Sequence, residues 1–72
     1  MKYTVKQYFN EIHWDNSYTE DKTEAEEWKA YMEDKSRSIW DRVNGNALEE
    51  FIKEYNIIDA ESIEVVVEIV ED

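Results

Sequence analysis

The sequence predicts a small α+β domain in the order strand, helix, helix, strand, with a small antiparallel or mixed sheet packed against two helices. Two patterns carry this prediction: apolar and polar residues alternate near both ends of the chain, and apolar residues recur at helical spacing between them. With 72 residues and no linker rich in Pro or Gly, we expect a single domain, residues 1–72. A chain of this size is only just long enough for a stable core.

The first strand is predicted over residues 2–9, where β-branched and aromatic side chains are dense. Tyr3, Val5 and Phe9 then share one side of the strand. A helix capped by Thr4 is the alternative, because Val5 and Phe9 also fit an apolar stripe of helical spacing. The periodicity alone leaves this choice open.

A polar loop and a long helix are predicted next. Residues 15–22 are rich in Asn, Ser, Thr and Asp, as expected of a loop. A capping box formed by Thr23 and Glu26 predicts that a helix begins there and runs over residues 23–43. Trp28 lies on the apolar side of this helix and is expected in the core.

A second, shorter helix is predicted after the chain's only glycine. Gly45 is expected to close the long helix in the left-handed conformation, and Asn46 is expected to cap the next one. Leu48 and Phe51 belong to the apolar stripe of this second helix.

Residues 62–70 show the clearest strand pattern of the chain. Aliphatic residues alternate with a second set that mixes carboxylates and valines: Ile63, Val65, Val67 and Ile69 against Glu64, Val66, Glu68 and Val70. The aliphatic side is expected to pack on the helices. Pairing with the first strand would bring its lysines, Lys2 and Lys6, opposite the two carboxylates.

A homodimer is expected because a two-stranded sheet with open edges is poorly stable alone. The chain has no cysteine, so disulfides cannot supply the missing stability. Either the edge strands of two copies join, or the dimer interface buries Val66 and Val70.

The charge of the chain excludes several classes of function. Nineteen acidic residues against eight basic ones give a net charge of −11. Nucleic acids and anionic membranes require a basic face, so direct binding to either is not expected. No stretch is long and apolar enough to span a membrane, and we therefore expect a cytoplasmic protein.

No pattern indicates catalysis, a cofactor or a metal. His13 is the only histidine and has no Cys or Ser partner in a recognisable arrangement. Acidic and hydroxyl residues between Asp15 and Glu26 follow the spacing of a calcium loop, but Glu20 stands where the sharp turn requires Gly. An ordinary acidic loop with a helix cap is the favoured interpretation.

Acidic residues collect on the outer side of both predicted helices: Glu26, Glu27, Glu33, Asp34 and Asp41 on the first, and Glu49, Glu50 and Glu54 on the second. Residues 15–72 carry eighteen acidic and six basic residues, more imbalance than solubility needs. Duplex DNA carries about one negative charge per 1.7 Å, so a surface of dense carboxylates can occupy a DNA-binding cleft. Trp40 lies away from the core side and is a candidate anchor for a partner.

In its size, its acidity and its lack of Cys and Pro, the whole chain resembles the small acidic DNA-mimic proteins that bacteriophages use against their hosts. It also resembles the host-takeover products of large Bacillus phages, among them an inhibitor of the nucleoid protein HU. The resemblance implies an inhibitor, not an enzyme, that works in the host cytoplasm and blocks the DNA-binding surface of a basic protein.

HU is the favoured target because it binds DNA largely through backbone charge, which a mimic without bases can reproduce. RNA polymerase, restriction enzymes, repair enzymes and CRISPR effectors are other basic targets. The alternative function is a non-enzymatic interaction or assembly module whose acidity serves solubility.

Overall fold

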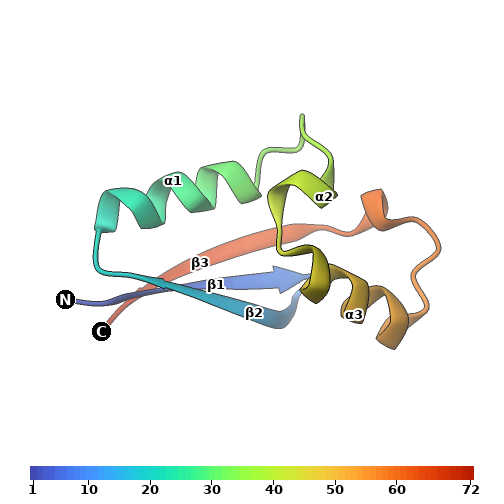
Figure 1. The fold of residues 1–72 in the computed structure, drawn as a ribbon, viewed down its shortest axis with the longest axis horizontal. Coiled ribbons are helices and arrows are strands. Elements are labelled where there is room, and N and C mark those ends of the chain that lie inside the picture. Colours follow the sequence, from blue (N-terminus) through green and yellow to red (C-terminus); the bar gives the residue numbers. More distant parts are fainter.

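The computed structural model describes all 72 residues as a three-stranded antiparallel sheet with three α-helices (Figure 1). The elements are β1 Tyr3–Phe9, β2 Ile12–Thr19, α1 Lys22–Met32, α2 Ile39–Arg42, α3 Gly45–Tyr55 and β3 Val65–Glu71, with a short 3-10 helix, Ala60–Ser62, before β3. The strand order in the sheet is β2-β1-β3. The α+β class is confirmed, whereas the predicted four-element order is wrong because it lacks β2 and one helix.

β1 and β2 form a hairpin joined by a two-residue turn. Asn10 and Glu11 have φ values of 50° and 71°, and two positive values in succession match the twist of a tight hairpin. The predicted loop over residues 15–22 is therefore wrong, because most of it is β2 paired with β1. The calcium-loop spacing falls on this strand and on the start of α1.

β3 pairs antiparallel with β1, so the two strands of the sequence analysis are neighbours in the sheet. The strand interpretation of the N-terminal segment is confirmed over Tyr3–Phe9. Lys6 lies opposite Glu68, one of the two carboxylates expected across from the lysines. Lys2 is opposite neither of them and lies beside Asp72, whose amide donates to the Lys2 carbonyl oxygen at 2.9 Å.

The predicted long helix over residues 23–43 is two helices, α1 and α2, separated by a loop. The break follows from residues that bind their own backbone: the carboxylate of Asp34 accepts from both the amide and the hydroxyl of Ser36. Ser38 then caps α2. The predicted capping box is also wrong, because Asp21 caps α1 and Thr23 lies inside the helix.

The ends of α3 are set by two asparagines. Asn44, not Asn46, caps its start with a side-chain oxygen, and Gly45 is the first helical residue, without a positive φ. Asn56 ends α3 in the left-handed conformation. That conformation was expected instead at Gly45, at the end of the preceding helix. The prediction of a helix in this region is confirmed.

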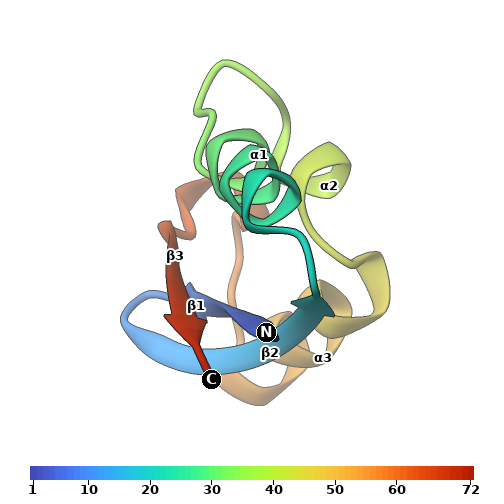
Figure 2. The ribbon, with the colours of Figure 1, turned by 90° about the vertical axis from the view of Figure 1, so that its left-hand side faces the viewer.

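The core lies between one face of the sheet and the helices. Val5 and Phe9 of β1 and Val65 and Val67 of β3 are buried there, together with residues from all three helices. Figure 2 shows α1 and α2 on the same side of the sheet. The indole of Trp14 packs edge-on against Phe51, and this contact fixes α3 beside the hairpin.

No helix covers the opposite face, which we call the open sheet face. The β1 residues on it are neighbours of the buried ones, and the pairing registers place β2 and β3 side chains beside them. Its residues are Thr4, Lys6 and Tyr8 of β1, His13, Asn16 and Tyr18 of β2, and Val66, Glu68 and Val70 of β3.

A candidate acidic interface at two ends of the molecule

Most of the negative charge has no basic partner within the protein. Among nineteen carboxylate side chains, only Glu33 and Asp34 lie within 4.0 Å of a basic nitrogen. These two pairs join Glu33 to Lys29 at 3.0 Å and Asp34 to Arg37 at 3.5 Å. The remaining carboxylates have no basic partner within the protein, although some of them, such as Asp21 and Glu61, accept hydrogen bonds in the fold.

The predicted site residues of the first helical region are divided by the helix break. Glu26 and Glu27 are exposed on α1, and Asp41 is exposed on α2 next to Trp40, which is 45% exposed. Because α1 ends before the break, these carboxylates do not form the single row that a continuous helix would have produced.

Glu33 and Asp34 have roles inside the fold. Glu33 Oε2 accepts a hydrogen bond from the Val67 amide at 2.9 Å in addition to its ion pair. Asp34 shapes the loop after α1, and the hydrogen bonds from the Ser36 hydroxyl and amide lower its pKa, with a smaller contribution from Arg37. Both carboxylates are thus engaged before any partner arrives.

The three predicted site residues of α3 are all exposed, and no hydrogen bond or ion pair engages their carboxylates: Glu49, Glu50 and Glu54. We call these residues the α3 acidic end. They lie on the outer side of α3 because Leu48 and Phe51, on the other side, are fully buried.

A second group of carboxylates lies where β2 meets α1 and where the chain ends. Figure 1 places both termini beside the start of α1. We call this group the α1 acidic end, which comprises Glu20, Asp21, Glu24, Glu26, Glu27, Glu71 and Asp72. Sequence reasoning missed five of these residues as a group, because only the antiparallel pairing of β1 with both other strands brings Glu71 and Asp72 near residues 20–24.

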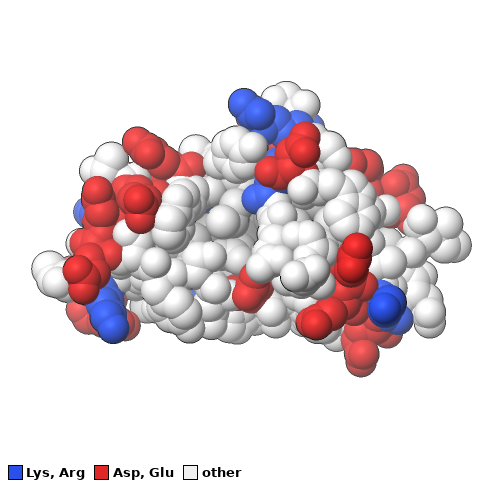
Figure 3. All heavy atoms as spheres, viewed as in Figure 1, with Lys and Arg blue, Asp and Glu red and all other residues white.

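Figure 3 shows that most acidic atoms gather toward the two ends of the long axis, with a largely uncharged stretch between them. The longest dimension of the molecule is 39 Å. A net charge of −11 over 39 Å is about one charge per 3.5 Å, close to the roughly 3.4 Å per phosphate of one DNA strand. The average charge per unit length is thus close to that of one DNA strand, although the carboxylates are concentrated at the two ends.

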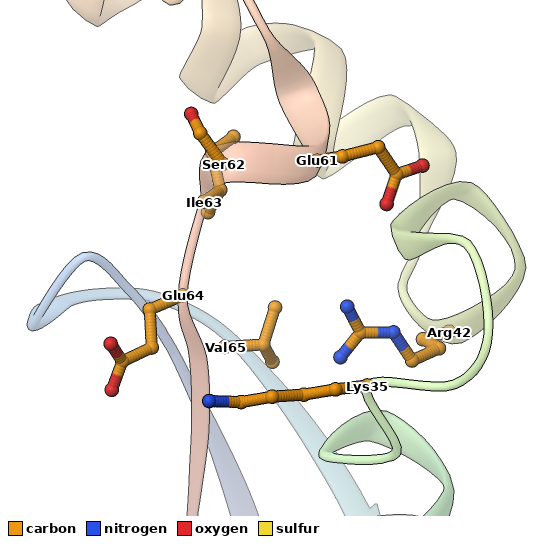
Figure 4. A pocket seen from close by; sticks show the side chains of 7 residues that line it. All are labelled: Lys35, Arg42, Glu61, Ser62, Ile63, Glu64 and Val65. Atoms are coloured by element: carbon orange, nitrogen blue, oxygen red, sulfur yellow. The ribbon is translucent and has the colours of Figure 1, made fainter.

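One pocket of about 210 Å³ lies between the 3-10 helix, β3 and the loop after α1 (Figure 4). Arg42 lines it, but its guanidinium donates to the carbonyl oxygens of Met32 at 2.7 Å and Arg37 at 3.1 Å. Glu61 accepts from the Ser38 hydroxyl and the Ile39 amide, and these bonds lower its pKa. The polar groups of this pocket hold the fold together.

The structure contains no group of three His, Cys, Asp or Glu side chains placed to hold a metal ion. None of its helices has the length and apolar character needed to cross a membrane. Comparison with family models, curated proteins and solved structures found no match for this chain.

Proposed function

We propose that the protein is a DNA mimic that binds a basic DNA-binding protein of a host cell and blocks its DNA-binding surface. The observation that supports this function is the pair of acidic ends, whose carboxylates are exposed and lack basic partners within the protein. A surface of this kind attracts a partner that neutralises phosphates with Lys and Arg.

The amount of negative charge favours a partner that reads the DNA backbone and not the bases. Averaged over its length, the molecule carries about one net negative charge per 3.5 Å, near the value for a single strand, and the largely uncharged stretch between the acidic ends offers no base edges. HU, which binds DNA with little sequence preference, is the favoured target on this ground.

The test is competition between the protein and a labelled DNA duplex for purified HU. We expect the protein to displace the duplex at 50 mM salt and to lose affinity steeply at 200 mM, because steered association between opposite charges is screened. Basic DNA-binding proteins of the other target classes are tested in the same way.

Removing charge from one acidic end tests whether HU binding depends on the position of the carboxylates or only on the net charge of the protein. Glu49→Gln combined with Glu50→Gln removes two free carboxylates of the α3 acidic end. The control, Glu11→Gln with Glu64→Gln, removes the same charge from two other exposed positions. We expect the first pair to weaken HU binding about tenfold or more and the control pair to change it less than threefold, since each contact of this kind contributes about 1 kcal/mol.

Equal losses in both pairs would show that only net charge matters, and absence of any basic DNA-binding target would refute mimicry. The assembly-module alternative is favoured by a different observation, the open sheet face, which has its own test below.

A further inference from the structure

The open sheet face is the least charged large surface of the molecule. Its only charged residues are Lys6 and Glu68, which lie directly opposite each other on β1 and β3. Val66 is 40% exposed and Tyr18 is 65% exposed on the same face. A surface with zero net charge on a chain of net charge −11 is the one place where two copies can approach without strong repulsion.

The centre of the β3 edge cannot pair with another strand, because side chains of this protein already bind its backbone. The hydrogen bonds of Asn10 with Glu64 and of Lys2 with Asp72 show that even-numbered β3 residues bond to β1. In an antiparallel pair the bonding alternates, so the backbone groups of Val67 point away from β1. Lys29 Nζ donates to the Val67 carbonyl oxygen at 2.7 Å, and Glu33 Oε2 accepts from the Val67 amide at 2.9 Å. A strand from a second chain would need these same backbone groups.

The edge of β2 is also a poor template for a new strand. Its register with β1 shifts between Gln7 and Tyr8, which is a β-bulge that twists the strand. The Asn16 amide is bonded to the Asp15 carboxylate at 2.9 Å, and the Asn16 side chain is bonded to His13. Joining of edge strands is therefore disfavoured on both sides of the sheet.

We propose that two copies of this chain associate through their open sheet faces, around a two-fold axis. The face is self-complementary, because a two-fold axis that runs parallel to the strands, midway between β1 and β3, brings Lys6 of each copy over Glu68 of the other, while Val66 and Val70 supply apolar contact. This inference does not depend on the proposed function, and its readout is the oligomeric state alone.

The size of the face sets the expected strength. A strand of seven residues is roughly 23 Å long at about 3.3 Å per residue, and three strands are roughly 14 Å wide at about 4.8 Å per strand. The open sheet face therefore covers roughly 320 Å². This is below the roughly 800 Å² per partner of a standard interface, so we expect a weak dimer with a dissociation constant in the micromolar range. Sedimentation velocity between 1 and 200 μM measures it, because these concentrations span that range.

Val66→Glu places a carboxylate in the centre of the proposed interface, and Ile58→Glu is its matched control. Ile58 is fully exposed and lies outside the sheet, so the control adds the same charge to a surface apolar residue. We expect Val66→Glu to raise the dissociation constant at least about tenfold and Ile58→Glu to leave it within threefold. Circular dichroism verifies that both variants stay folded.

Salt and a charge exchange provide two further measurements. Raising salt screens the repulsion between the acidic ends, so the dimer is expected to strengthen from 50 to 500 mM, in contrast to binding of a basic partner. Lys6→Glu or Glu68→Lys alone should weaken the dimer, and the double variant should restore it. A monomer at 200 μM in 500 mM salt, or equal weakening by Val66→Glu and Ile58→Glu, would overturn the inference.

Discussion

Lys29 and Val67, which are 38 residues apart in the sequence, are joined by a 2.7 Å hydrogen bond from the lysine ammonium to the backbone carbonyl oxygen. Glu33, one turn along α1, completes the arrangement by accepting from the Val67 amide at 2.9 Å. The ion pair of Lys29 and Glu33 thereby satisfies the carbonyl and the amide of an edge-strand residue, to which a neighbouring strand would otherwise bond.

Glu33→Ala is expected to lower the free energy of unfolding by about 1 to 2 kcal/mol, because the Val67 amide loses its acceptor and Lys29 loses its ion partner. Chemical denaturation measures this loss, and hydrogen exchange should show reduced protection at the Val67 amide. Glu27→Ala, at an exposed position of the same helix, is the control and should change stability by less than about 0.5 kcal/mol. Unchanged exchange at Val67 would contradict the assigned role of Glu33.

Glu11→Gly is expected to stabilise the protein by about 0.5 to 1 kcal/mol. Glu11 adopts a φ of 71°, which costs a residue with a side chain roughly 1 to 2 kcal/mol, while glycine adds about 0.5 to 1 kcal/mol of entropy to the unfolded chain. The relief of strain therefore exceeds the entropic cost. Thermal denaturation of the two proteins checks the sign.

Asn10→Gly is the matched control in the same turn. Asn10 also has a positive φ, but its side-chain oxygen accepts from the Glu64 amide at 2.9 Å, and asparagine tolerates this conformation well. We expect this variant to lose about 1 kcal/mol through the missing hydrogen bond. Stabilisation by Asn10→Gly, or destabilisation by Glu11→Gly, would argue against a strained turn at Glu11.

Glu61→Gln is expected to lower the melting temperature at pH 7, and this effect is expected to shrink as the pH falls below 4.5. The carboxylate of Glu61 accepts from two donors at the start of α2, and these bonds lower its pKa below the ordinary value of 4.5. A group with a lowered pKa in the folded state stabilises the protein above its unfolded pKa and loses that effect as pH falls through the folded pKa.

The difference between wild type and Glu61→Gln should therefore be full above about pH 5 and disappear in acid, as measured by melting curves across the pH range. Glu54→Gln is the control, because the Glu54 carboxylate is exposed and makes no hydrogen bond. This control should be neutral or slightly stabilising at pH 7, since it reduces the repulsion of a chain with net charge −11. A difference for Glu61→Gln that does not change between pH 7 and the acid end of the range would exclude the charge of Glu61 as its cause.

The sequence predicts the two strands with alternating patterns, the position of Lys6 opposite Glu68, and the exposure of all the acidic helix residues except Glu33 and Asp34. β2 escapes prediction because its residues 15–19 are polar, and because its hairpin turn carries Glu11 where glycine is the usual signal. What makes this segment a strand is its pairing with β1 across the hairpin turn, which the polar composition of the segment does not reveal.

The break between α1 and α2 has a similar origin. The apolar spacing of Trp28, Met32 and Ile39 fits one continuous helix, but the loop between the helices is held by tertiary contacts of Glu33 with β3 and of Arg42 with α1. Glu33 and Asp34 accept hydrogen bonds within the fold, so they do not belong to the candidate interface. The candidate interface therefore consists of the α3 acidic end and the α1 acidic end.

Arg42→Lys tests the contact that holds this loop. Arg42 is only 8% exposed, and its guanidinium bridges the carbonyl oxygens of Met32 and Arg37. A lysine ammonium lacks the planar fork needed to reach both acceptors, so we expect a loss of about 1 to 2 kcal/mol by chemical denaturation. Arg37→Lys, at an exposed position whose ion pair with Asp34 is solvated, should cost less than about 1 kcal/mol. If both variants cost the same, the bridge does not hold the loop, because a bridging guanidinium must be more sensitive to its geometry than an exposed one.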